Sequence, residues 1–242
     1  MKSGPVATPL AISIIIPTFN EAGHIGRLLR HLQHICHSDA AVEIVVADGG
    51  STDRTTQEAA EAGARVVTSP RKGRAAQLNF GASQASGNLL YFLHADTFPP
   101  ATLLTDLRAA VAAGYSSGCY RLTFDEPHWF LQANAWFTRF SPEPFRFGDQ
   151  SLFVLPEIFR KAGGYREDMI VFEDQEITRR LRQHGKFRVL PEQIVTSARK
   201  YRDNGPIRLQ SVYYLITLLY RLGVPQPKLA EVYRSLIRQD KV

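Results

Sequence analysis

Short apolar runs alternate with helical stretches through the first half of the chain, and this alternation limits the fold more than any other feature. Apolar runs at 12–16, 42–47, 65–67 and 89–93 predict strands, and each leads into a stretch with apolar side chains at helical spacing. Such a repeat predicts a parallel sheet with right-handed crossovers. We therefore predict an α/β protein with a mostly parallel sheet flanked by helices.

The second half is less regular. Strands are expected at 118–124, 148–155 and 187–190, and helices at 128–140 and 173–184. A further helix over 206–222 begins at Pro206, and a short polar helix finishes the chain. The α/β part is therefore expected to be followed by a C-terminal helical extension.

Composition restricts the class of protein and its partners. The 242 residues are 44% hydrophobic, which suits one α/β domain with a small appendage. A net charge of +6 favours an anionic partner, such as a nucleotide, a phospholipid surface or a nucleic acid. Because no nucleic-acid-binding module is recognisable, we expect no nucleic-acid partner.

Cysteine content and hydropathy indicate the compartment. Cys36 and Cys119 are the only cysteines, too few for a disulfide framework, and they fit a reducing environment. The first residues lack the apolar core of a signal peptide, and the uncharged run 209–220 is shorter than the ~20 residues that span a bilayer. We expect a cytoplasmic protein without a transmembrane helix.

Two strand ends carry clusters of polar residues. The first strand ends in P-T-F-N-E (17–21) and the second in D-G-G-S-T-D (48–53). Ligands of open α/β sheets bind at the carboxyl ends of the strands, so both segments should border one site. The Asp48 carboxylate can accept hydrogen bonds from a base or ribose, and Gly49 lets the backbone approach a ligand. The alternative is a capped turn with no ligand.

A basic loop precedes the third predicted helix. Arg71, Lys72 and Arg74 surround Gly73 at the start of that helix. Free backbone N–H groups and the helix dipole favour a phosphate there. A solvated basic turn is the alternative interpretation.

The motif His94-Ala95-Asp96 follows an apolar strand. Asp96 offers the oxygen ligand that Mg²⁺ and Mn²⁺ prefer, and His94 is a softer ligand that Mn²⁺ tolerates. Such an ion can bridge a diphosphate. Alternatively, Asp96 only caps the turn before Pro99.

Glu173 and Asp174 begin a charged helix. Either carboxylate could serve as a general base. Acidic residues in a first turn also stabilise the helix dipole by about 0.3–1 kcal/mol, which is the alternative explanation. Asp149 is a further carboxylate with no role that its spacing indicates.

In combination, these segments resemble the family 2 inverting glycosyltransferases, which have the GT-A fold. The resemblance covers about residues 12–184 and rests on P-T-F-N-E, V-V-A-D-G-G-S-T-D, R-K-G-R, F-L-H-A-D-T and F-E-D-Q-E-I-T-R-R-L in the family's order. The chain is most similar to a small bacterial subgroup with H-A-D in place of the usual D-x-D, which leaves one strong carboxylate where many relatives have two. S-A-R-K-Y (197–201) stands in place of the Q-x-x-R-W motif of processive synthases, which implies a non-processive enzyme.

The resemblance implies transfer of a sugar from a nucleotide-diphosphate sugar to an acceptor hydroxyl, with a UDP-sugar as the first expectation and a GDP-sugar as the second. The residues that would bind this donor are Pro17, Thr18, Asn20, Glu21, Asp48, Gly49, Lys72, Arg74, Ala95, Asp96, Arg199 and Lys200. Asp96 and His94 would hold Mn²⁺ or Mg²⁺. Asp174 would take the proton from the acceptor, with Glu173 as the other catalytic candidate.

The resemblance also implies the division of the chain. A GT-A domain would cover 1–205, with a nucleotide-binding half at about 12–97 and an acceptor half at about 98–205, and the extension would cover 206–242. The alternatives are a nucleotidyltransferase, which should show a Gly-rich basic signature after the first strand, and a non-catalytic nucleotide-sugar-binding protein at a membrane surface.

Three fates are open for the helix at 206–222: packing on the sheet domain, pairing in a homodimer, or lying on an anionic membrane. Lipid-linked acceptors are common among similar enzymes, so we expect peripheral, salt-sensitive association with the inner membrane face. Arg199, Lys200 and Arg202 are expected to assist this helix.

Overall fold

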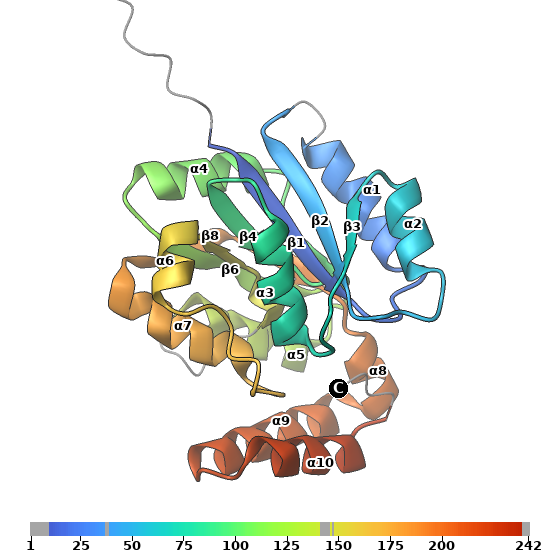
Figure 1. The fold of residues 1–242 in the computed structure, drawn as a ribbon. Coiled ribbons are helices and arrows are strands. Elements are labelled where there is room, and N and C mark those ends of the chain that lie inside the picture. Colours follow the sequence, from blue (N-terminus) through green and yellow to red (C-terminus); the bar gives the residue numbers. More distant parts are fainter. Residues whose placement is uncertain (1–9, 37–38, 141–145, 147, 239–242) are drawn as a thin grey trace, which may run out of the picture.

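The computed structural model describes residues 10–36, 39–140, 146 and 148–238. Figure 1 shows one twisted sheet with helices on both faces and a pair of helices below it. The eight strands follow the order β3-β2-β1-β4-β7-β6-β8-β5. They are β1 (Ile12–Thr18), β2 (Val42–Asp48), β3 (Arg65–Thr68), β4 (Leu89–Phe92), β5 (Thr97–Phe98), β6 (Ser117–Phe124), β7 (Leu152–Val154) and β8 (Phe187–Thr196).

The helices connect these strands and then extend beyond the sheet. The α-helices are α1 (Ile25–Cys36), α2 (Thr55–Glu61), α3 (Arg74–Gln84), α4 (Leu103–Ala112), α5 (Trp129–Trp136), α6 (Pro156–Lys161), α7 (Glu173–His184), α8 (Arg199–Asn204), α9 (Pro206–Arg221) and α10 (Gln226–Leu236). Within the described residues, the 3₁₀ turns are η1 (Phe137–Arg139) and η3 (Gly148–Gln150).

The strand directions confirm the predicted α/β fold. Strands β3, β2, β1 and β4 are parallel neighbours, and β8 runs parallel to β6. Strand β7 pairs antiparallel with both β4 and β6, and β5 pairs antiparallel with β8. The sheet is therefore mostly parallel, and among its strands β5 and β7 run antiparallel to their neighbours.

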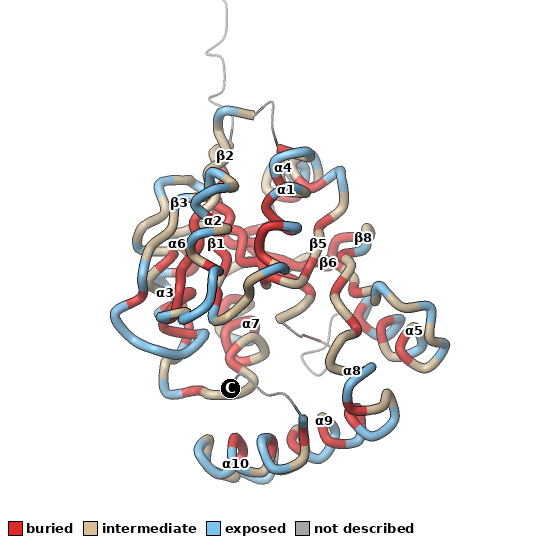
Figure 2. The backbone as a smooth tube through the Cα atoms, turned by 90° about the vertical axis from the view of Figure 1, so that its right-hand side faces the viewer, coloured by how far each residue is buried: buried red, intermediate tan, exposed pale blue. Residues whose placement is uncertain are grey.

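Alternating side chains of β1 bury both faces of the sheet. Ile12, Ile14 and Ile16 pack into the core under α1 and α4, whereas Ile15 faces the core under α3, α6 and α7. All four side chains are fully buried. Burial of one such side chain contributes roughly 1.5–3 kcal/mol, so this register is strongly specified. Figure 2 shows the buried residues concentrated in the centre of the sheet domain, where the strands lie.

The parallel register brings the polar ends of these strands together. Thr18 at the end of β1 lies opposite Asp48 at the end of β2, and Asp48 lies opposite Thr68 of β3. The loops after these strands therefore form one rim of the sheet. In Figure 1 this rim faces α8, α9 and α10.

Two predicted strands of the second half were wrong in extent. The run 148–155 divides into η3 and the short strand β7, because Ser151 between them has a left-handed backbone, with φ of 59°, which interrupts an extended strand. The buried Gln150 side chain donates to the Tyr120 carbonyl at 2.9 Å. The strand expected to stop at Leu190 continues to Thr196, because the register of β6 and β8 shifts after Tyr120 and absorbs Pro191 in a bulge.

The helix predicted at 206–222 forms as α9 and has two apolar faces. Val212 and Ile216 pack against α10, whereas Ile207 and Leu222 are exposed. Within the described ranges, none of the helices is both long and apolar enough to cross a membrane. The domain boundary expected at residue 205, between α8 and α9, stays a prediction.

Candidate active site

Asp48 organises the turn after β2. Its carboxylate accepts hydrogen bonds from the hydroxyls of Thr18 (3.0 Å) and Ser51 (2.5 Å). The backbone amides of Gly50 and Ser51 donate to its other oxygen, both at 2.8 Å. A carboxylate can accept about four hydrogen bonds, so these four donors satisfy Asp48 fully. The residue is only 1% exposed. Asp48 therefore holds the turn after β2 in place.

The loop after β1 is fastened to the loop after β2. Asn20 adopts a left-handed backbone with φ of 53°. Its amide donates to the Ser51 hydroxyl at 2.9 Å, and its side-chain oxygen accepts from the Thr52 amide at 2.9 Å. The Glu21 amide donates to the Thr55 hydroxyl at 2.7 Å. The two predicted segments therefore lie side by side.

A buried glutamine that sequence reasoning missed joins the two strand ends. The Gln77 side chain of α3 donates from Nε2 to the carbonyls of Thr18 (2.7 Å) and Ala47 (2.9 Å). A Cβ atom at Gly49 would lie 3.0 Å from this amide, so Gly49 lets α3 approach the turn closely. The only signal in the sequence was a polar residue among the apolar positions of a helix.

The basic loop separates into residues with different partners. Arg71 forms an exposed ion pair with Glu167 at 2.7 Å. Lys72 is exposed. Arg74, in contrast, pairs at 2.6 Å with Glu173, whose side chain is only 2% exposed. Glu173 raises the pKa of the Arg74 guanidinium above its usual range, so the cation is retained at any working pH. Of the loop, Arg74 comes nearest to the carboxylates of α7.

Three residues form a cluster suited to a metal ion. His94, Asp96 and Asp149 each offer one ligand atom, and these atoms lie within 4.8 Å of one another. His94 Nδ1 lies 3.0 Å from Asp149 Oδ1. Ala95, between the first two residues, is buried. Asp149 of η3 therefore supplies a second carboxylate to the H-A-D motif.

The chemistry of the cluster fits a divalent cation. Burial disfavours charge on His94, but its hydrogen bond to Asp149 raises the His94 pKa overall. Burial and the neighbouring Asp149 charge raise the pKa of Asp96. A cation would relieve the repulsion between the two carboxylates. Two oxygens with one imidazole nitrogen suit Mn²⁺ better than Mg²⁺, which prefers oxygen ligands alone.

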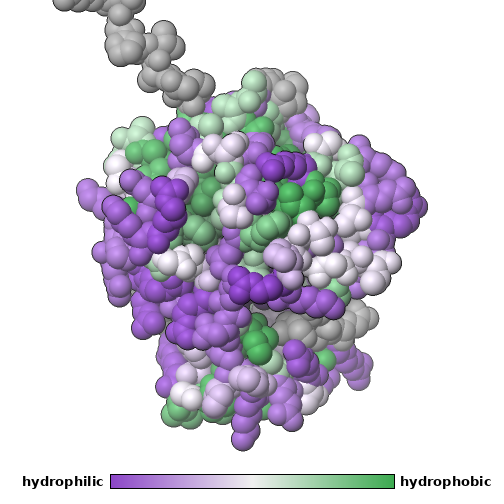
Figure 3. Space-filling model, in the orientation of Figure 1, coloured by the Kyte–Doolittle hydropathy of each residue, from purple (hydrophilic) through white to green (hydrophobic). Residues whose placement is uncertain are grey.

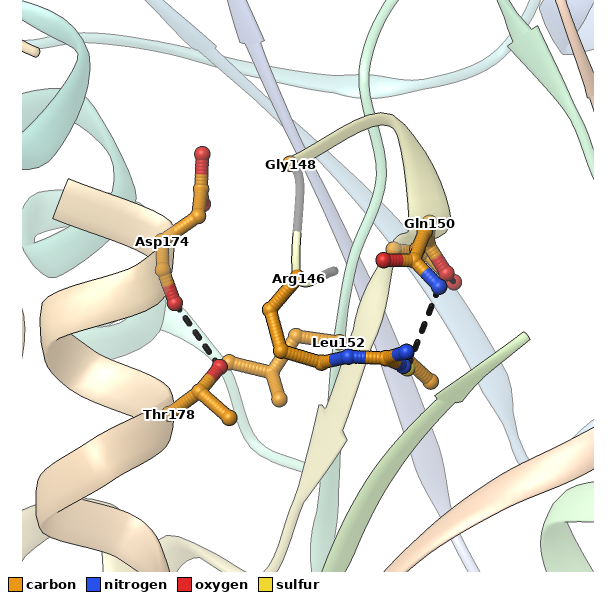
Figure 4. A pocket seen from close by; sticks show the side chains of 8 residues that line it. Arg146, Gly148, Gln150, Leu152, Asp174 and Thr178 are labelled. Carbon is orange, nitrogen blue, oxygen red and sulfur yellow. Dashed lines mark hydrogen bonds between the residues drawn. The ribbon is translucent and has the colours of Figure 1, made fainter. Parts of the chain in front are cut away.

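Gly148 lies between Asp174, the candidate general base, and His94 of the metal-binding cluster. A Cβ atom at this position would lie 2.3 Å from Asp174 Oδ2 and 2.5 Å from His94 Cε1. The two side chains therefore approach the same point of the backbone from different elements. Figure 4 shows Asp174 and Thr178 on α7, across the pocket from Gly148. The residues lining the adjoining pocket are Leu78, Phe92, His94, Gly148, Ser151, Leu152, Tyr165 and Asp174.

The first residues of α8 approach the site from the C-terminal side. Arg199 donates to His24 Nε2 at 2.9 Å, which connects α8 to the loop after β1. Burial raises the pKa of Asp96, and the positive charge of Arg199 lowers it. Burial likewise acts to raise the pKa of Asp149, and the charge of Lys200 lowers it. Both cations therefore act on the cluster electrostatically.

The helical extension holds the loop before α7, another contact that the sequence did not indicate. Gln226 at the start of α10 accepts hydrogen bonds from the amides of Ile170 (2.9 Å) and Val171 (3.0 Å). The Phe172 and Tyr220 rings stack with centroids 4.9 Å apart. Phe172 has a left-handed backbone, with φ of 65°, directly before the two carboxylates of α7.

Residues 13–170 match the family model of glycosyl transferase family 2. The chain belongs to glycosyl transferase family 2. Its curated relatives include the undecaprenyl-phosphate 4-deoxy-4-formamido-L-arabinose transferase of Pseudomonas paraeruginosa, which is 35% identical over 112 residues. That match covers 43% of this chain and only 33% of the relative, so the chain spans about a third of the protein it resembles.

Solved structures of similar fold cover most of this family 2 chain. The mannosyltransferase of Pyrobaculum calidifontis, solved with GDP-Man and Mn²⁺, has a TM-score of 0.71 at 19% identity, over 94% of this chain and 70% of that one. S. aureus TarS, solved with UDP-GlcNAc, has a TM-score of 0.64 at 16% identity, over 94% of this chain and 71% of that one. At these identities the likeness concerns the fold, and it confirms the GT-A architecture.

Proposed function

We propose that the protein is a non-processive, inverting glycosyltransferase that moves a sugar from a nucleotide-diphosphate donor to an acceptor hydroxyl. The observation that carries the proposal is the convergence of Asp174 and His94 on Gly148. A base candidate and a metal-binding cluster thereby border one pocket at the carboxyl ends of the parallel strands. Family membership supports the same reaction class.

In this proposal Asp174 accepts the proton of the acceptor hydroxyl as its oxygen attacks the anomeric carbon of the donor sugar. The C1–O bond to the diphosphate breaks as the new bond forms on the opposite face, so the configuration at C1 inverts. Arg74, held by Glu173, and Arg199 with Lys200 stabilise the negative charge on the departing nucleoside diphosphate.

The donor and metal follow from the contacts at the strand ends. Pro17, Thr18, Asn20, Glu21 and Asp48 would enclose the nucleoside, and Lys72 would remain near the nucleotide. His94, Asp96 and Asp149 would hold Mn²⁺. When bound, this ion would neutralise charge on the diphosphate. A UDP-sugar is the first choice of donor and a GDP-sugar the second, since the similar structures were solved with both nucleotide types.

We propose that the acceptor hydroxyl belongs to a lipid-linked molecule, by analogy with the Pseudomonas relative, whose name includes undecaprenyl-phosphate. The enzyme would then work at the inner face of the membrane, on the cytoplasmic side. This assignment agrees with the excess of basic residues.

A donor screen tests the reaction. Purified protein is incubated with Mn²⁺, an acceptor lipid extract and single UDP- or GDP-sugars, and release of nucleoside diphosphate is followed. The anomeric configuration of the product, measured by NMR, distinguishes inversion from retention. A nucleotidyltransferase would instead transfer the nucleoside monophosphate and release sugar 1-phosphate, and a non-catalytic protein would bind donor without turnover. Either of these outcomes contradicts the proposal.

A further inference from the structure

Helix α9 exposes apolar side chains that take no part in its packing against α10. Leu209, Val212 and Ile216 already bury one side of the helix against α10. The opposite side carries Ile207, Tyr214, Leu215, Leu218 and Leu222, which are 65%, 59%, 41%, 55% and 71% exposed and which we name the apolar face of α9. Their spacing places them on one side of the helix.

A second apolar stripe lies on the neighbouring α5 and η1. Its members are Trp129, Trp136, Phe137 and Phe140, each more than 40% exposed, and we name it the aromatic stripe. The Tyr214 hydroxyl donates to Asn134 Oδ1 at 2.7 Å, which ties α9 to α5. Tryptophan and tyrosine favour the boundary between apolar and wet surroundings. Figure 3 shows hydrophobic atoms emerging among hydrophilic ones at the lower end of the molecule.

All charged residues on these elements are basic. Arg139, Arg208 and Arg221 are exposed, and α5, η1 and α9 contain no Asp or Glu. The Arg139 guanidinium lies over the Trp136 ring, 4.4 Å from its centroid. An exposed apolar surface bordered by arginines is complementary to an anionic lipid bilayer.

The charge also argues against pairing of two copies through this surface. A two-fold dimer would bring the arginines of one copy towards those of the other, without acidic partners on these elements. An anionic bilayer instead satisfies both the apolar side chains and the cations.

We infer that the apolar face of α9 and the aromatic stripe of α5 and η1 dock on an anionic membrane surface. This inference deepens the proposed function, because it states how a lipid-linked acceptor would be reached. The docking residues differ from those expected from the sequence. Of the three cations expected to assist, Arg202 is paired with Glu126 at 3.2 Å, Arg199 contacts His24, and Lys200 is half-buried at the start of α8.

Docking there would bring the active site to the lipid surface. Tyr220 of α9 stacks on Phe172, which directly precedes Glu173 and Asp174. The α9–α10 pair lies on the side of the sheet where β1 and β2 end (Figure 1). An acceptor head group at the bilayer surface would therefore lie close to the pocket.

Vesicle co-sedimentation with the full chain tests the inference. The wild type should sediment with vesicles of phosphatidylglycerol and phosphatidylcholine at low salt, and only weakly with phosphatidylcholine alone. The double variant Leu218→Ser/Leu222→Ser should bind at least about tenfold less tightly, since it removes apolar area from the contact. Arg208→Gln/Arg221→Gln should lose roughly fivefold per arginine, and the wild type should show a comparable loss in high salt.

A matched control removes the same charge elsewhere. Arg160→Gln/Lys161→Gln alters two exposed residues of α6, and it should sediment like the wild type. Circular dichroism confirms that each variant is folded. Wild-type protein that stays in the supernatant, or an equal loss in the control, overturns the inference. A dimer in light scattering that Leu218→Ser/Leu222→Ser dissociates would also overturn it, by assigning the face to self-association.

The proposed function has a separate readout, which is stabilisation of the protein by nucleoside diphosphates without vesicles. If vesicles fail to bind but UDP or GDP raises the melting temperature, only the docking inference is wrong. If vesicles bind but no nucleotide stabilises the protein, the donor site is wrong and the docking surface stands.

Discussion

Two adjacent carboxylates on the first turn of α7 have different surroundings, and the difference separates their roles. Glu173 is 2% exposed and is engaged by Arg74. Asp174 lines the pocket beside Gly148 and is half-buried. A side chain that exchanges a proton with a substrate must be reachable by it. Asp174 meets that condition, whereas Glu173 is suited to holding Arg74 in position.

Replacing Asp174 should therefore impair chemistry more than binding. We predict that Asp174→Asn lowers kcat by about 10²-fold or more, the scale expected when a general base is lost. Donor affinity, measured by calorimetry, should stay nearly unchanged because the amide keeps the shape of the side chain.

Glu173→Gln is the matched comparison. It keeps the fold of α7 but weakens the hold on Arg74, so it should raise KM for the donor more than it lowers kcat. Turnover of Asp174→Asn at the wild-type rate would move the base to another carboxylate, with Asp149 the next candidate.

Gly148 offers a test that introduces no charge. A methyl group at this position would lie 2.3 Å from Asp174 Oδ2 and 2.5 Å from His94 Cε1, so both side chains must move. We predict that Gly148→Ala reduces kcat by at least about 10²-fold, since small displacements of positioned groups have effects of this size.

The control is Gly26→Ala in α1, where a Cβ atom has only ordinary contacts at 3.4 Å and 3.6 Å. It should keep full activity and raise the unfolding free energy by roughly 0.5–1 kcal/mol, as expected for alanine in a helix. Steady-state kinetics that leave Gly148→Ala as active as this control would show that the site tolerates the displacement.

At the scale of elements, the sequence predicted those helices and strands whose positions depend on neighbouring residues in the chain. Strands β1 and β2 have near-continuous apolar runs, and α7 begins at its acidic first turn, so their positions followed from the sequence. The run containing Gln150 did not form one strand because Ser151 has a left-handed backbone, beside the Gln150 side chain that donates to a carbonyl of β6. Strand β8 passed through Pro191 because the register shift opposite Tyr120 and Arg121 of β6 leaves Pro191 and Glu192 as a bulge in β8 itself. Both exceptions depend on contacts distant in sequence.

Contacts between residues distant in sequence also limited the prediction of the candidate active site. Asp48 and Asp96 were found as candidates because each follows an apolar strand. Asp149 joins the metal cluster only through the pairing of β7 with β4, and the partners of Gln77 are backbone carbonyls that no motif marks. Sequence patterns thus indicated the rim of the site but not the residues that complete it.

Gln77 gives a prediction about how α3 supports the two strand ends. Gln77→Leu leaves the carbonyls of Thr18 and Ala47 without this donor, and an unsatisfied buried group costs about 1–3 kcal/mol. Urea unfolding should show a loss of that size, and nucleotide affinity should fall because both strand ends border the site.

The matched control is Gln33→Leu, which removes an exposed side-chain bond to the Ala62 carbonyl. It should change stability by less than about 0.5 kcal/mol, as is usual at surfaces. Equal effects of the two substitutions would contradict the structural role given to Gln77.

For the whole molecule, donor binding should appear as thermal stabilisation. A nucleoside diphosphate at 100 times its Kd should stabilise the native state by about 2.7 kcal/mol. For a chain of this size that corresponds to a rise of about 5–10 °C in Tm. We predict a larger rise with Mn²⁺ present. Calorimetry that detects no binding of UDP or GDP, with or without Mn²⁺, would contradict the donor site.

The metal-dependent part of that rise should require Asp96. Asp96→Ala removes one carboxylate from the cluster, so it should abolish the additional stabilisation by Mn²⁺ while the nucleotide alone still acts. Glu61→Ala, an exposed carboxylate at the end of α2, should respond to Mn²⁺ like the wild type.

The hydrogen bonds between Gln226 of α10 and the loop before α7 have a consequence for the order in which the chain folds. Every strand of the sheet precedes Gln226 in the chain, yet Ile170 and Val171 need its side chain as their acceptor. On a ribosome, the sheet can therefore form before the loop that carries Phe172 into α7 is secured. Catalytic competence would arrive only after the hydrophobic core of the sheet is closed, and a nascent chain would begin to work only once α10 has docked.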